Sequence, residues 1–65
     1  MTATAANMAE LEAALEDLLD AVTDAEAAVM NCADLPELLQ YAALAVEFAK
    51  ISKAKQRYRL ARRAV

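Results

Sequence analysis

The chain contains no glycine and a single proline, Pro36. Tight β-hairpin turns depend on residues such as glycine that accept a positive φ, so their absence disfavours a β-rich fold. Much of the 60% apolar fraction is alanine, which favours helix without supplying much hydrophobic area. The composition therefore predicts a mostly helical chain with one break, close to the proline.

The length of 65 residues allows one small domain. A chain of this size buries only about 60% of its unfolded surface, and small domains usually add disulfides, a metal or oligomerisation. One cysteine and no histidine leave no internal disulfide and no structural zinc site, so we predict no cofactor. Association with another copy or another protein is the expected source of further burial.

The first helix is predicted over residues 8–31, after a disordered tail at 1–6. Asn7 followed by Glu10 fits an N-cap with an acid at the third helical position. Apolar residues then alternate in steps of three and four, as in a heptad seam. They are Met8, Leu11, Leu15, Leu18, Val22, Ala25 and Val29. The opposite face is acidic, so the helix has one apolar stripe.

The second helix is predicted over residues 35–63. Asp34 followed by Glu37 repeats the capping pattern, and Pro36 fits the first turn, where a missing N–H costs nothing. The short link forces the helices antiparallel. We therefore predict a single all-α domain over 1–65, an antiparallel two-helix hairpin that completes a four-helix bundle by dimerisation or by docking on a partner.

The second helix carries apolar residues on most of its circumference. One stripe consists of Leu35, Leu39, Ala42, Val46 and Ala49. A second stripe, on nearly the opposite side, consists of Tyr41, Leu44, Phe48, Ile51 and Tyr58. Only a narrow strip with Gln40 and Glu47 reads as solvent-facing. The first helix can cover one stripe, so we predict that the second stripe is a protein interface.

All lysines and arginines lie between residues 50 and 63, and all acids between residues 10 and 47. In a hairpin where residue numbers adding to about 66 face each other, the acidic start of helix one meets Lys50, Lys53 and Lys55. We therefore predict charge matching within the hairpin or between subunits, which selects orientation more than it stabilises.

A second set of basic residues lies on the other side of the helix and stays free. It consists of Lys55, Arg59, Arg62 and Arg63, which could contact an acidic protein or nucleic acid. Tyr58 could stack on a base. The net charge of −3 repels a polyanion and disfavours the nucleic-acid interpretation.

No catalytic apparatus is visible, and we predict that the protein is not an enzyme. The acids of the first helix read as a solvated face, and Cys32 lacks a general base. No signal peptide and no membrane-length apolar run are seen, and the basic segment's apolar side is mostly alanine, so we expect a cytoplasmic protein with no membrane partner.

The second half of the chain resembles the second helix of the exonuclease VII small subunit. The matching positions are Asp34, Leu35, Pro36, Tyr41, Ala45, Val46, Ala49, Lys50, Ala54 and Lys55. This resemblance implies a non-catalytic subunit that packs its hairpin on the long helices of a nuclease. In shape alone, the chain is also similar to small hairpin co-chaperones of secretion needles and to phage-encoded helical inhibitors.

These observations together predict a non-catalytic adaptor, assembly, chaperone or inhibitor protein that acts through protein contacts of its second helix. Its partner would be a second copy, as a homodimer, or a larger protein. The alternative is a nucleic-acid-associated protein or a small accessory subunit of a nuclease.

Overall fold

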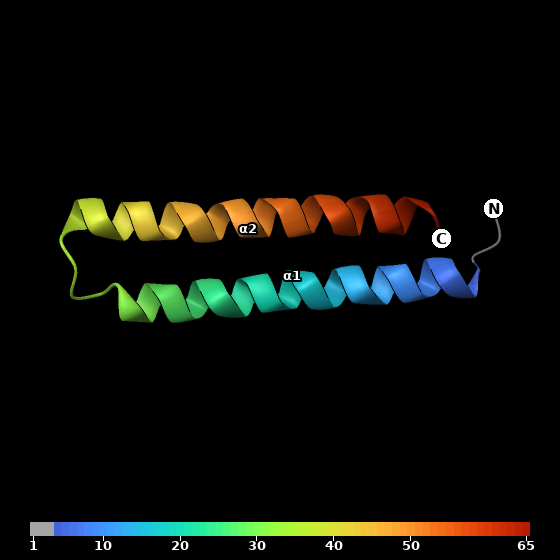
Figure 1. Ribbon diagram of the computed structural model, residues 1–65, viewed down its shortest axis with the longest axis horizontal. Helices are drawn as coiled ribbons and strands as arrows, with labels where there is room; N and C mark the ends of the chain where they lie inside the picture. The colour runs from blue at the N-terminus through green and yellow to red at the C-terminus, as the bar shows by residue number, and fades with distance from the viewer. Residues whose placement is uncertain (1–3) are drawn as a thin grey trace.

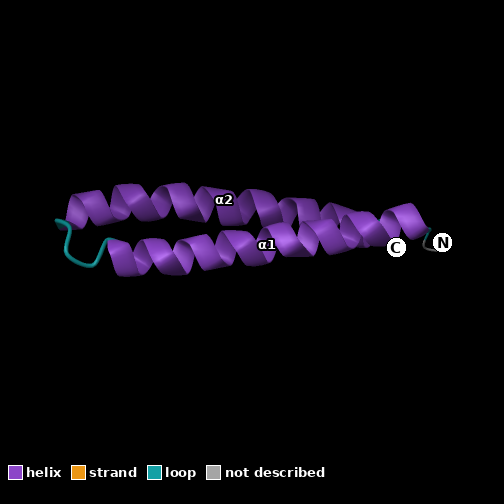
Figure 2. Ribbon diagram, turned by 60° about the horizontal axis from the view of Figure 1, so that its bottom comes forward, coloured by secondary structure: helices purple, strands orange, loops and turns teal. Residues whose placement is uncertain are grey.

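The computed structural model describes residues 4–65 and consists of two long antiparallel helices, α1 (Ala5–Asn31) and α2 (Glu37–Arg63) (Figure 1). The predicted all-α hairpin is confirmed. Each helix has 27 residues and so spans about 40 Å, which gives a rod of 51 × 14 × 9 Å. Figures 1 and 2 both show the helices side by side from the turn to the opposite end.

The start of α1 differs from the prediction. Thr4, rather than Asn7, is the N-cap, and its hydroxyl oxygen accepts a hydrogen bond of 3.1 Å from the Asn7 N–H. Ala5 and Ala6, which the sequence analysis placed in a disordered tail, form the first turn of α1, and the rest of that tail, 1–3, lies outside the described residues. Asn7 instead donates from Nδ2 to the Ala64 carbonyl at 3.0 Å, because this amide lies on the side facing α2.

The link between the helices is closed by main-chain and glutamine hydrogen bonds. Cys32 N–H donates to the Ala28 carbonyl, and Leu35 N–H donates to the Cys32 carbonyl. Gln40 reaches back from α2, with Nε2 2.7 Å from the Leu35 carbonyl oxygen. The predicted cap at Asp34 is wrong: Pro36 occupies the N-cap position without a side-chain cap, and α2 begins two residues later than expected.

The helices meet along a heptad seam built largely from alanine. On α1 the covered residues fall into two columns, here called a and d as in coiled coils. Column a holds Leu11, Leu18, Ala25 and Cys32, and column d holds Asn7, Ala14, Ala21 and Ala28. On α2, column a holds Leu44, Ile51 and Tyr58, and column d holds Gln40, Glu47, Ala54 and Ala61. The alanines at d, three on α1 and two on α2, let the two backbones approach closely.

This seam corrects the predicted one. Leu11, Leu18 and Ala25 face α2 as expected, but the column of Met8, Leu15, Val22 and Val29 stays exposed at its edge. The strip of Gln40 and Glu47, predicted to face solvent, lies half-buried against α1. The physical reason is that the alanine column of α1 leaves room for these longer side chains, whereas two bulky columns would hold the helices apart.

The hairpin has almost no core of its own. Its buried apolar residues are Ala14, Ala21, Cys32 and Ala61, and no large side chain of residues 4–65 is fully buried. Large apolar side chains remain on the surface of both helices, up to 80% exposure at Leu38. The two helices therefore cover only one of the apolar faces that the sequence provides.

Candidate protein-binding surface

One edge of the seam is closed by an ion-pair cluster around Arg57. Its guanidinium contacts both carboxylate oxygens of Glu10, at 2.9 and 3.1 Å, and the carboxylate of Asp17 one heptad further along α1. The hydrogen bond from Arg57 lowers the pKa of Glu10, and the same contact raises the pKa of Arg57. Asp24 and Lys50 continue the same two columns, so we call these five residues the charged flank.

The predicted pairing of acidic residues of α1 with basic residues of α2 is made by one basic residue, Arg57, which contacts Glu10 and Asp17. Lys50, Lys53 and Lys55 were expected to make these contacts, but Arg57 makes them. The reason is the register: residues whose numbers add to about 70 lie opposite each other, whereas the prediction assumed about 66. Lys50 instead pairs with Glu47 of its own helix at 3.2 Å. The pairs of Arg57 join the two helices and are exposed, so they favour this register more than they stabilise the hairpin.

The other edge of the seam is apolar along α1 and the first half of α2, and Lys55 and Arg62 follow on the second half of α2. The column beside column a, called e, holds Met8, Leu15, Val22 and Val29 on α1 and begins with Tyr41 and Phe48 on α2. In an antiparallel helix pair the two e columns lie on one side and the two g columns, here the charged flank, on the other. We call these six residues the apolar flank. All six are exposed, including Tyr41 at 62% and Phe48 at 60%.

The five predicted interface residues separate into two groups. Leu44, Ile51 and Tyr58 lie in column a and are partly covered by α1, whereas Tyr41 and Phe48 are exposed on the apolar flank. The Tyr41 hydroxyl donates to Glu37 Oε1 at 2.7 Å, and this hydrogen bond raises the pKa of Tyr41. A role for all five in binding a partner stays a prediction.

The side of α2 that points away from α1 is also apolar over its first half. Leu39 and Val46 are exposed there, and Leu35, in the link just before α2, is exposed as well; all three belong to one of the two predicted apolar stripes. We call these three residues the outer ridge. Of the two stripes predicted on opposite sides of α2, α1 partly covers the aromatic one, at Leu44, Ile51 and Tyr58. The other stripe stays exposed.

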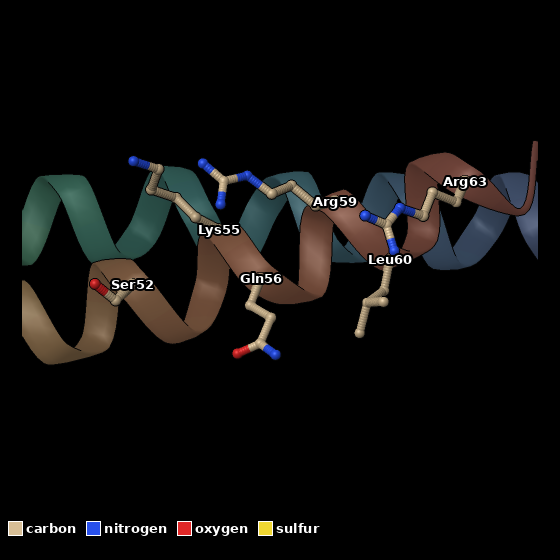
Figure 3. A pocket seen from close by; sticks show the side chains of 6 residues that line it. All are labelled: Ser52, Lys55, Gln56, Arg59, Leu60 and Arg63. Atoms are coloured by element: carbon tan, nitrogen blue, oxygen red, sulfur yellow. The ribbon is translucent and has the colours of Figure 1, made fainter.

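The predicted basic residues gather on the second half of α2. Lys55, Arg59 and Arg63 line a shallow groove of about 380 Å³ with Ser52, Gln56 and Leu60 (Figure 3). In Figure 3 the side chains of Lys55 and Arg59 point to one side of α2, and those of Gln56 and Leu60 to the other. We call the groove lined by these six residues the basic groove. Within residues 4–65, Lys55, Arg59, Arg62 and Arg63 form no ion pair.

Residues 4–65 contain neither a candidate metal site nor a candidate membrane span. No cluster of three or more acidic, cysteine or histidine side chains there could hold a metal ion. Neither α1 nor α2 contains a stretch that is both apolar and long enough to cross a membrane.

The alanine column of α1 was not predicted to lie in the seam, although it holds two of the most buried residues, Ala14 and Ala21. Its signal was present, since Ala14, Ala21 and Ala28 recur every seven residues, but ranking residues by hydrophobicity hid it behind the leucines. Searches of protein-family models, of curated proteins and of solved structures found no match to this chain.

Proposed function

We propose that the chain is a non-catalytic assembly module that works by docking exposed apolar side chains of α2 against another protein chain. The observation that supports this most directly is the lack of a core: alanines and one cysteine are buried while leucine, valine and aromatic side chains are exposed. Exposed apolar area of this extent, bordered by charge, is typical of protein interaction sites.

Two surfaces of α2 could take part, and both lie near the turn. Tyr41 and Phe48 belong to the apolar flank, and Leu39 and Val46 belong to the outer ridge. Aromatic side chains with most of their area free are the residue type that most often carries binding energy at interfaces. Fully covering one leucine, valine or phenylalanine contributes about 1.5–3 kcal/mol, so a few suffice for specific association.

The test is capture from an extract of the source organism with a tagged chain. We compare the wild type with Phe48→Asp, Val46→Asp and the control Thr23→Asp, which adds the same charge at an exposed polar position of α1 outside the proposed surfaces. The proposal expects a protein, including the untagged chain itself, that the wild type and Thr23→Asp retain and at least one apolar variant loses. Equal retention by all four proteins contradicts it.

The basic groove supports a second candidate, binding of nucleic acid. Three cationic side chains line one groove with two polar ones, and none of the cations is paired within residues 4–65. Fluorescence anisotropy with a single-stranded oligonucleotide tests this. The candidate requires binding that weakens as salt rises and that Arg59→Gln reduces, and no binding at low salt removes it.

The resemblance to the exonuclease VII small subunit suggests one class of larger partner, the long helices of a nuclease. Under the proposed function, such a partner would occupy the outer ridge, the apolar flank or both. Identification of the retained protein by mass spectrometry distinguishes a nuclease from other partners.

A further inference from the structure

We propose that the apolar flank binds the apolar flank of a second copy, giving a four-helix bundle in which both turns lie at the same end. This inference rests on the proposed function and names its first partner. It leaves the outer ridge of each α2 on the outside of the bundle.

The first argument is the number of apolar columns. A two-stranded coiled coil needs apolar residues at a and d only, whereas a helix that faces the centre of a bundle carries a third column at e or g. Helix α1 carries Met8, Leu15, Val22 and Val29 at e over its whole length. Its own hairpin leaves these four side chains 39–55% exposed, so an isolated hairpin covers the third column only in part.

The second argument is surface area. The hairpin has an accessible surface of 5014 Å². A compact monomer of 7.0 kDa has about 4,000 Å², so this chain exposes roughly 1,000 Å² more. A standard protein–protein interface covers about 800 Å² on each partner. One second copy seated along the flank is therefore of the right size to remove the excess.

The third argument concerns the register of the same-end arrangement. With both turns at the same end, the two-fold axis runs along the bundle, and α1 faces α2 of the second copy in the register of the hairpin itself. Residue numbers adding to about 70 then meet, so Val22 lies opposite the second copy's Phe48, and Val29 opposite its Tyr41. Apolar side chains thus face apolar side chains over the half of the bundle nearest the turns, and Leu15 and Met8 lie opposite the second copy's Lys55 and Arg62.

Charge supports the same orientation. Glu12 and Arg59 lie in the column next to e, called b, and form no ion pair within residues 4–65. The same-end bundle places Glu12 opposite the second copy's Arg59. The opposite-end bundle would place Glu12 opposite Glu26 of the second copy, acid against acid. Complementary charge in column b therefore favours the same-end bundle.

Sedimentation equilibrium of the purified full chain tests the surface. We expect the wild type to be a dimer and Phe48→Asp to weaken dimerisation on the order of 100-fold or more, since the two-fold axis introduces the charge twice. Val46→Asp is the matched control, an apolar-to-acid change on the outer ridge of the same helix, and should leave the dimer unchanged. Far-UV circular dichroism checks that both variants stay helical.

Cysteine cross-linking tests the orientation and does not depend on a destabilising variant. In a Cys32→Ala background, Leu19→Cys and Ser52→Cys each add one exposed thiol in column b. The same-end bundle brings residue 19 opposite residue 52 of the second copy, so a disulfide forms in a mixture of the two variants. The opposite-end bundle would bring residue 19 opposite residue 19, and each variant would then cross-link alone.

The outcomes separate this inference from the proposed function. Cross-linking only in the mixture, with loss of the dimer in Phe48→Asp but not in Val46→Asp, supports the same-end bundle. Self-cross-linking, a dimer that depends on Val46, or a monomeric wild type at about 100 µM overturns it. A monomer that still captures another protein through Phe48 leaves the proposed function standing, whereas a monomer that captures nothing removes both.

Discussion

Glu47 offers the sharpest test of how the seam is built. This carboxylate occupies a d position between alanine-lined turns of α1, its side chain is only 14% exposed, and Oε2 is buried without a hydrogen-bond partner in the described structure. A buried polar group left unsatisfied costs about 1–3 kcal/mol. Leucine has a similar volume, and covering most of its side chain contributes about 1.5–3 kcal/mol. Glu47→Leu should therefore stabilise the hairpin.

Against this gain stands the loss of the exposed pair with Lys50, worth about 0–1 kcal/mol. Replacing a buried charge by an apolar residue of similar volume is typically neutral to stabilising by about 1–4 kcal/mol, so we expect a net gain of about 2 kcal/mol. In a domain of this length, 1 kcal/mol corresponds to about 4–8 °C, and Tm should rise by roughly 10 °C.

The assay is thermal and urea unfolding followed by circular dichroism, at one fixed protein concentration because association shifts apparent stability. Glu16→Leu is the matched control, the same change at an exposed position of α1, and should alter stability by about 0.5 kcal/mol or less. The reasoning is refuted if Glu47→Leu is no more stable than the wild type at equal helical content, or if Glu16→Leu gains as much.

Three further predictions concern the rest of the hairpin. Ala14→Leu should destabilise it by about 1–3 kcal/mol in urea unfolding, because it overfills the closest contact of the seam, whereas Ala9→Leu on the exposed face should not. Thr4→Ala removes the N-cap of α1 and should cost about 1 kcal/mol by the same assay, while unchanged stability would place the cap elsewhere. Since the folded state lowers the pKa of Glu10, its stabilising effect is present above the ordinary value of 4.5 and lost as pH falls through the lowered pKa. The loss of Tm on acidification should thus shrink in Arg57→Gln, and an equal loss would contradict the role of this pair.

The helices themselves could be predicted from the sequence because their signals are local. Lack of glycine and a single proline predicted two long helices with one break, and the predicted C-terminal ends at 31 and 63 agree with the observed ends, Asn31 and Arg63. The N-terminal ends were less accurate, because several residues can serve as caps and the choice depends on contacts elsewhere. Thr4 is the cap, and the side-chain amide of Asn7 instead donates to the Ala64 carbonyl across the hairpin.

The seam was harder to predict because the seven-residue repeat alone does not show which columns of α1 face α2. Three adjacent columns of α1 have the same seven-residue repeat, and hydropathy favours the outermost one, Met8 to Val29. The structure selects the alanine column instead, because small side chains allow the tightest approach of two helices within one chain. The sequence predicted more apolar surface than one hairpin covers, and the structure agrees, but which columns stay exposed depends on how the two helices pack, which periodicity does not give.

The hydrogen bond between Asn7 and the Ala64 carbonyl, 3.0 Å long, also fixes the two ends of the hairpin beside each other. Because the two ends lie together, the hairpin can be inserted into a surface loop of an unrelated carrier protein without separating the ends of that loop. The inserted hairpin would project as a rod about 40 Å long, with Tyr41 and Phe48 exposed in the half farther from the carrier.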